Sequence, residues 1–174
     1  YFNAAGADPN PPEGQEIGES HEPESHLIPL AISAALNLDK KNSRLKVFGN
    51  DYATADGTCV RDYIHVNDLA EAHCLALKLL STDNFSGDVE ESNKLGLALN
   101  LGTAHGASVK EVIAAVESVT GKAVPFDLVN RRPGDPPALV ADYSKAAKIL
   151  GWQPQFDLNQ TVESAYNWEL KRRY

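Results

Sequence analysis

Two neighbouring arginines and an aspartate lie in a short loop rich in proline and glycine, Arg131-Arg132-Pro133-Gly134-Asp135-Pro136-Pro137. Guanidinium groups on a stiff loop can form bidentate hydrogen bonds to phosphate oxygens. The aspartate can hold an arginine or accept hydrogen bonds from sugar hydroxyls. Composition alone leaves two interpretations open, an anion-binding loop and a solvated surface loop.

Two further segments have the residue types for anion binding. Arg61 lies on Val60–His65, where apolar and polar residues alternate; such an arginine usually faces solvent, but in an acidic protein it can serve an anionic ligand. Residues 97–108 are predicted to form a strand, a turn at Gly102 and the start of a helix. The backbone N–H groups at the start of a helix favour an anion. They lack the G-x-G-x-x-G spacing and an acidic ribose partner, so a tightly packed turn is the favoured interpretation.

The remaining reactive residues show no catalytic or metal-binding pattern. The five histidines have no ligand spacing, and G-x-S-x-G, Walker and H-E-x-x-H motifs are absent. We therefore predict no metal site, and no motif marks a catalytic residue. Cys59 and Cys74 are too few for a disulfide framework, which favours a reducing, cytoplasmic setting.

The elements that must position these segments alternate between helix and short strand, which predicts an α/β fold. Asp68, Ser108 and Asp157 are candidate helix N-caps, and Gly121 and Gly151 are candidate helix ends. The polar stretch Ser81–Gly96 is predicted to be an exposed loop. The predicted helices are 26–38, 69–79, 109–120, 144–150 and 158–172, and the predicted strands are 1–3, 45–48, 60–65, 97–101 and 124–129.

Length and charge narrow the class of protein further. A chain of 174 residues that is 43% hydrophobic and 23% charged suits one folded domain. The formal net charge of −8 argues against a nucleic-acid or anionic-membrane partner, and no apolar run approaches the roughly 20 residues of a membrane span. Because the chain contains no methionine and opens at Tyr1-Phe2-Asn3, we expect it to be a piece of a longer protein.

Taken together and in order, six segments resemble UDP-glucose 4-epimerases, which are NAD-dependent enzymes of the extended short-chain dehydrogenase/reductase type. The resemblance covers nearly the whole chain, and the run from Phe48 to His73 is the most specific part. The segments are YFNAAGADP, HLIPL, LKVFGNDYATADGTCVRDYIHVNDLAEAH, LNLGTAHGASVKEVI, RRPGDPPALVADYSKA and LGWQP.

The resemblance implies that residues 1–174 correspond to the second, substrate-binding half of such an enzyme. The fold implied is a small mixed α/β substrate-binding domain, with strands and a helix that complete an NAD-binding Rossmann-type domain in the intact enzyme. The first half would carry a G-x-x-G-x-x-G turn and a catalytic Tyr-x-x-x-Lys pair, and neither occurs in this sequence. We therefore expect this chain alone to lack epimerase activity.

The resemblance also implies roles for individual residues. Tyr1 and Phe2 match positions beside the nicotinamide of NAD. The other matches are to the UDP-sugar site: Asn3; Ser25, His26 and Leu27 at the diphosphate and uridine; Lys46, Val47 and Phe48 at the uracil; Arg61 and Arg132 at the diphosphate; Asp135 at the ribose; and Leu139 at the hexose. His26 stands where asparagine is common in the family.

The activity implied is the interconversion of UDP-glucose and UDP-galactose through a 4-keto intermediate, in an intact enzyme that is a cytoplasmic homodimer. Two alternatives stay open beside it. The first is another UDP-sugar-modifying member of the superfamily, a dehydratase or decarboxylase, which would share the same UDP anchors. The second is a non-catalytic nucleotide-sugar-binding module. A third reading, an α/β domain without a ligand, is disfavoured by the ordered match of several motifs.

Overall fold

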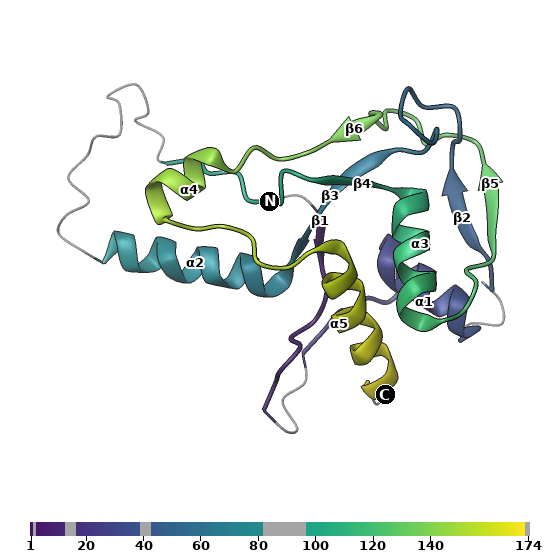
Figure 1. The fold of residues 1–174 in the computed structure, drawn as a ribbon, viewed down its shortest axis with the longest axis horizontal. Coiled ribbons are helices and arrows are strands. Elements are labelled where there is room, and N and C mark those ends of the chain that lie inside the picture. Colours follow the sequence, from purple (N-terminus) through teal and green to yellow (C-terminus); the bar gives the residue numbers. More distant parts are fainter. Residues whose placement is uncertain (2, 13–16, 39–42, 82–96, 173–174) are drawn as a thin grey trace.

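The computed structural model describes residues 1, 3–12, 17–38, 43–81 and 97–172 and has a mixed α/β architecture (Figure 1). Its helices are α1 (Leu27–Leu36), α2 (Val66–Leu80), α3 (Val109–Thr120), α4 (Ser144–Leu150) and α5 (Leu158–Lys171). Its strands are β1 (Asn3–Ala5), β2 (Leu45–Phe48), β3 (Val60–His65), β4 (Gly106–Ser108), β5 (Phe126–Val129) and β6 (Ala138–Leu139).

Strand β3 is the centre of the larger sheet. Its second half pairs in parallel with β1, with Asn3 opposite Tyr63, and its first half pairs with antiparallel β4 and parallel β6. Strands β2 and β5 form a separate parallel pair, with Phe48 opposite Val129. These pairings bring Arg61 on β3 and the loop that follows β5 to neighbouring parts of the molecule (Figure 1).

Helices α1, α3 and α5 pack against one another and form the main core with the inner face of β2. The helix ends are set by local sequence, because Ser108 with Glu111 and Asp157 with Gln160 form capping boxes that open α3 and α5. Both are the caps that the sequence predicts. The fully buried residues of this core include Ala31, Ile32, Val112, Val116 and Val162.

A second core joins α2 to α4 through Trp152, whose indole N–H donates to the Asp68 carbonyl at 3.0 Å. The prediction that Asp68 caps α2 is wrong. The Asp68 carboxylate instead accepts hydrogen bonds from the backbone N–H groups of Gln155 and Phe156. The cap is His65, whose Nδ1 accepts the N–H of Asn67 at 3.0 Å. Because Asp68 is only 1% exposed, its carboxylate contacts residues that are distant in the sequence, and a local sequence pattern cannot reveal such contacts.

The predicted strands 45–48 and 60–65 and the predicted helix 144–150 are confirmed to the residue. The predicted strand 97–101 is wrong, because the backbone edges of β3 are occupied by β1, β4 and β6, and residues 97–101 have no strand partner in the described part of the chain. The predicted loop Ser81–Gly96 lies outside the described residues except for Ser81.

Among the described helices, none combines the length and the apolar character needed to cross a membrane.

Buried His65 makes the stability of the fold depend on pH. Because its Nδ1 accepts a backbone N–H, its Nε2 carries the proton and donates to Ser164 Oγ at 3.0 Å, while the ring stacks on Phe156. Burial lowers the pKa of His65 to about 4, so the unfolded chain binds this proton more readily than the folded chain. The contribution to stability is complete above about pH 6.5 and is lost as the pH falls toward 4.

We expect the free energy of unfolding to fall by about 3 kcal/mol between pH 6.5 and pH 4 on account of His65 alone, since each pKa unit is worth about 1.4 kcal/mol. Urea unfolding of the wild type and His65→Gln across this range measures it, because the variant has no titrating imidazole. Parallel pH profiles in the two proteins would show that His65 does not cause the loss.

Candidate functional site

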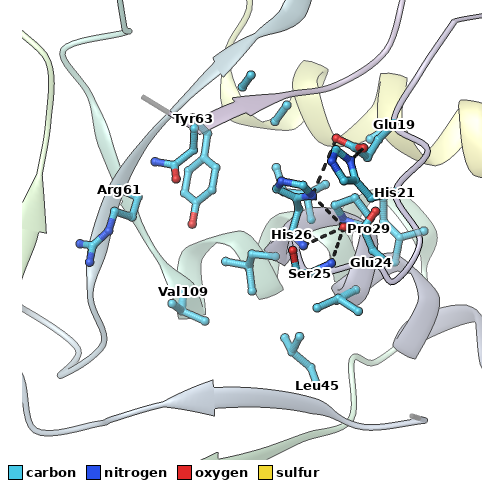
Figure 2. Close-up of a pocket in the computed structure, with 18 of the residues that line it drawn as sticks. Glu19, His21, Glu24, Ser25, His26, Pro29, Leu45, Arg61, Tyr63 and Val109 are labelled. Carbon is cyan, nitrogen blue, oxygen red and sulfur yellow. Dashed lines mark hydrogen bonds and ion pairs between the residues drawn. The ribbon is translucent and has the colours of Figure 1, made fainter. Parts of the chain in front are cut away.

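A cavity of about 1000 Å3 lies between β1, the first turn of α1, β2, the start of β3 and the loop that follows β5. Figure 2 shows Arg61 and Tyr63 extending from β3 on one side, and Ser25, His26 and Pro29 at the start of α1 on the other. The cavity therefore collects residues from both ends of the chain. Its volume suits a ligand of nucleotide size or larger.

Arg61 lies at the edge of this cavity and its side chain is only 12% exposed. Its guanidinium donates one hydrogen bond to the Asp135 carboxylate and another, at 2.6 Å, to the Val60 carbonyl. Asp135 belongs to the Pro/Gly loop, so this ion pair joins the loop to β3. The pair also fixes the guanidinium in one orientation, with its remaining N–H donors available to a ligand.

The two consecutive arginines of the loop face different surroundings. Arg132 lines the cavity, and its guanidinium lies 4.0 Å from the centre of the Phe48 ring. Arg131 is outside the cavity lining, where it packs 4.2 Å over the Tyr52 ring and forms an ion pair with Asp51. Because β5 runs parallel to β2 with Val129 opposite Phe48, the loop leaves the pair of strands next to the Phe48 ring. Only Arg132 of the two is therefore placed to bind an anion in the cavity.

The opposite wall is the N-terminus of α1, and its N-cap, His26, makes no side-chain capping hydrogen bond. The unpaired N–H groups of a first helical turn carry a partial positive charge. Four cationic side chains, Arg44, Lys46, Arg61 and Arg132, line the cavity beside four carboxylates, Glu19, Glu24, Asp135 and Glu169. Arg61, Arg132 and this helical turn therefore provide positive charge locally and not over the whole cavity. The arrangement fits a ligand with negative charge at its centre.

A cluster of titratable side chains, Glu19, His21, Glu24 and His26, also lines the cavity (Figure 2). The hydrogen bond to the Glu19 carboxylate raises the pKa of His21. Burial acts to raise the pKa of Glu19, but the hydrogen bond with His21 and the charge of His26 outweigh it, so that this pKa is lowered. His26 also bonds Glu24 Oε1 through Nδ1 at 2.7 Å.

Sequence reasoning missed Glu19, His21 and Glu24. The signal that marks them is the density of acidic and imidazole side chains in Glu19-Ser-His-Glu-Pro-Glu-Ser-His26, which the apolar pattern of the following helix obscures. Tyr63 was also missed; its side chain points into the cavity, and burial raises its pKa. The neutral phenol is therefore a hydrogen-bonding group at ordinary pH.

Ten of the residues predicted from the resemblance line the cavity: Tyr1, Asn3, Ser25, His26, Leu27, Lys46, Phe48, Arg61, Arg132 and Asp135. Two do not. Val47 is 1% exposed and packs into the core, because side chains alternate along β2 and that of Val47 points to the opposite face from those of Lys46 and Phe48. Leu139 is 43% exposed on β6, in register with Arg61. Phe2 lies outside the described residues.

The turn after Leu101, which has the order of a phosphate-binding strand, turn and helix, binds a carboxylate of the chain itself. The Asp62 side chain is fully buried and accepts the backbone N–H groups of Thr103 and Ala104. Gly102 is needed here because a Cβ would lie 2.4 Å from the Ala141 Cβ. The structure thus supports the packed-turn interpretation of this segment.

A second cavity, of about 540 Å3, shares Tyr63 with the first and is lined by Thr103, Glu111, Gln155 and Asp157 among others. Among the described residues no lysine or arginine lines it, and it holds the carboxylates of Glu111 and Asp157. The first cavity, which has four cationic side chains, is therefore better suited to an anionic ligand than the second.

Comparison with known proteins shows which family the chain belongs to. The family model described as GDP-mannose 4,6 dehydratase matches residues 18–165. A UDP-glucose 4-epimerase of Rhizobium leguminosarum bv. trifolii is 50% identical over 171 residues, which are 98% of this chain and 47% of that protein. The chain thus spans about half the length of the curated relatives it matches.

Solved structures give the same result at the level of the fold. A UDP-glucose 4-epimerase from Stenotrophomonas maltophila, solved with NAD and formylated UDP-arabinopyranose, matches with a TM-score of 0.81 and 39% identity, over 98% of this chain and 46% of that one. The enzyme from Bifidobacterium longum, solved with NAD+ and UDP, matches with a TM-score of 0.78 and 37% identity over the same shares. Because the family model covers most of its length, the chain belongs to the family described as GDP-mannose 4,6 dehydratase, and it is a relative of the UDP-glucose 4-epimerases.

Proposed function

We propose that the cavity binds the UDP part of a UDP-sugar, and that the chain is the substrate-anchoring part of a UDP-glucose 4-epimerase. The observation that carries the proposal is that Arg61 and Arg132 line one cavity that also contains the aromatic ring of Phe48. The relatives named above as UDP-glucose 4-epimerases, and the UDP bound in one of them, support it.

In this proposal Arg61 and Arg132 bind the diphosphate, with the first turn of α1 (Ser25, His26 and Leu27) on its other side. Phe48 stacks on the uracil, beside Lys46 and the backbone of Val47. Asp135 accepts a ribose hydroxyl while keeping Arg61 in position. Arg132 lies over the Phe48 ring, so the same loop residue is close to both the proposed uracil site and the proposed diphosphate site.

Such an arrangement suits an epimerase because the two ends of the substrate have different requirements. The diphosphate is held by charge-assisted hydrogen bonds, which fix its position. The hexose has to present both faces of C4 in turn, so few strong contacts can hold it. NAD supplies the hydride acceptor when it is bound, mainly by the rest of the intact enzyme, with Tyr1 and Phe2 of this chain beside the nicotinamide and Asn3 contacting the sugar nucleotide.

The intact enzyme is further proposed to be a cytoplasmic homodimer that acts on UDP-glucose and UDP-galactose. A dehydratase of the same family is the second candidate, favoured by the description of the matching family model. The products distinguish the two: an epimerase interconverts UDP-glucose and UDP-galactose, whereas a dehydratase releases water and accumulates a keto sugar.

Nucleotide selectivity tests the proposed ligand. We expect calorimetric titration of the 174-residue chain to show tighter binding of UDP than of UMP by at least about tenfold, because the second phosphate gains charge-assisted hydrogen bonds worth roughly 1.5–3 kcal/mol each. ADP is the control for the base, and we expect it to bind more weakly than UDP. Equal affinities for UDP and UMP would contradict a diphosphate site at Arg61 and Arg132.

Leu139 is proposed to limit the sugars that the intact enzyme accepts, since it stands in register with Arg61 at the edge of the sheet. Leu139→Ser removes apolar bulk and is expected to raise the rate on UDP-N-acetylglucosamine relative to UDP-glucose by roughly 10–200-fold, the range for discrimination by an apolar wall. The ratio of kcat/KM for the two substrates is the measurement. An unchanged ratio would place Leu139 outside the hexose site.

A further inference from the structure

Three side chains at the edge of the main cavity have the types and the spacing of metal ligands. One ligand atom from each of Glu19, His21 and His26 lies within 4.8 Å of the other two. Glu19 binds His21 Nδ1 through one carboxylate oxygen, and its other oxygen lies 3.9 Å from His26 Nδ1. The two imidazole rings are 4.8 Å apart between centroids (Figure 2).

A fourth residue, Glu24, holds this cluster in place from behind. Its Oε1 accepts hydrogen bonds from the backbone N–H groups of Ser25 and His26 and bonds His26 Nδ1, each at 2.7 Å. A carboxylate on one ring nitrogen is the usual outer partner of a histidine that binds a metal through its other nitrogen, because it fixes the orientation of the ring. With Glu24 on Nδ1, His26 would bind the ion through Nε2. Glu24 Oε2 is buried and accepts no hydrogen bond from the described residues, which leaves a negatively charged oxygen uncompensated.

We propose that Glu19, His21 and His26 bind a divalent transition-metal ion of the zinc class. Two imidazoles and one carboxylate suit Zn2+, Co2+ or Ni2+, whereas Mg2+ and Ca2+ prefer ligand sets made of oxygen alone. Three protein ligands also leave a fourth position open to water or to a ligand oxygen. The positive ion would compensate the uncoordinated carboxylate charge of Glu24 as well as that of Glu19.

The geometry allows the ion to enter with small side-chain movements. Zinc bonds of about 2.0–2.1 Å in a tetrahedron place the ligand atoms about 3.4 Å apart, so the widest separation has to close by roughly 1.4 Å. His21 and His26 are 62% and 46% exposed in their side chains and have room to move. No metal site is predicted from the sequence. His21 and His26 do have the H-x3-5-H spacing of many zinc sites, but no C-x2-4-C pair accompanies them. The segment before α1 brings the three side chains together.

The test is zinc binding by the untagged 174-residue chain in the absence of nucleotide. We expect about one Zn2+ per chain by elemental analysis after gel filtration, and a visible absorption band on titration with Co2+ that excess Mg2+ does not remove. His21→Ala and His26→Ala should each weaken zinc binding by at least about 10–100-fold, since loss of an outer partner alone has that effect. Glu19→Gln should also weaken it.

His105→Ala is the matched control, because His105 is an exposed histidine outside the cluster. It should bind zinc as the wild type does. Failure of the wild type to bind stoichiometric zinc, or equal binding by the wild type and the His21→Ala/His26→Ala double variant, would overturn the proposal. Circular dichroism of each variant is the check that it is folded. Since no nucleotide is present, a negative result leaves the proposed UDP site untouched.

Discussion

Replacing Arg132 with alanine is expected to weaken UDP binding about 10–150-fold, which corresponds to a loss of roughly 1.5–3 kcal/mol. Arg132 lines the cavity, and its guanidinium lies 4.0 Å from the centre of the Phe48 ring and forms no ion pair with any of the described residues. It can therefore reach a diphosphate without first breaking an ion pair to another side chain that lines the cavity. Calorimetric titration with UDP gives the affinity of both proteins.

Arg131→Ala is the matched control for this experiment. The two arginines are adjacent in sequence, and each stacks on an aromatic ring, but Arg131 is directed to Tyr52 and Asp51 outside the cavity lining. Its removal is expected to change UDP affinity less than about threefold, in line with the small effect of an exposed charge. Equal losses in both variants would mean that the loop acts through its overall charge or its structure, and that Arg132 makes no direct contact.

Arg61→Ala is the less specific probe of the same site. Its removal also leaves the Asp135 carboxylate without this partner and removes the side-chain link between the loop and β3, although the backbone pairing of β3 with Pro137 and β6 remains. A loss of UDP affinity in this variant would therefore combine a lost contact with a displaced loop, which is why the Arg132 comparison carries more weight.

The largest effect on stability is expected for Asp62→Asn. The carboxylate is fully buried and accepts four hydrogen bonds, from the N–H and hydroxyl of Thr103 and from the N–H groups of Ala104 and Ala141. An amide can offer only one oxygen, so donors that the carboxylate satisfies are left unpaired or opposed by an NH2 group. Since each buried unpaired group costs about 1–3 kcal/mol, we expect a loss of roughly 2–6 kcal/mol in the free energy of unfolding.

Asp142→Asn serves as its control. Asp142 is exposed and accepts the N–H of Ser144 just before α4, a role that asparagine fills about as well as aspartate. We expect a change within about 0.5 kcal/mol in urea unfolding. A similarly small loss for Asp62→Asn would show that the turn at Gly102 does not depend on this carboxylate.

The parts of the fold that follow from local sequence are the ones that could be predicted. Capping boxes at Ser108 and Asp157 define helix starts within four residues of sequence, and alternation along Val60–His65 defines a strand. The anion-binding interpretation of the loop at 131–137 could be stated from residue types, but its orientation could not. Which of two adjacent arginines faces the cavity depends on the register of β5 against β2.

The features that could not be predicted depend on contacts between distant segments. Strand β6 has two residues and exists through its pairing with Val60 and Arg61, and Leu97–Leu101 has strand-like residues but no partner among the described strands. Asp68 has the sequence position of a helix cap, yet it binds backbone N–H groups 87 and 88 residues later in the chain. Local propensity describes a residue well only where no such distant partner competes for it.

The most direct measurement of the central claim is titration of the 15N-labelled chain with UDP, followed through its backbone amide resonances. We predict saturable shifts with one common dissociation constant for Leu27, Phe48 and Arg132, which line the main cavity from three separate elements. Thr103 and Gln155, which line the second cavity, should stay unchanged and report that binding is local. Unshifted resonances at the first three residues, or shifts confined to the second cavity, would contradict the assignment of the main cavity as a UDP-sugar site.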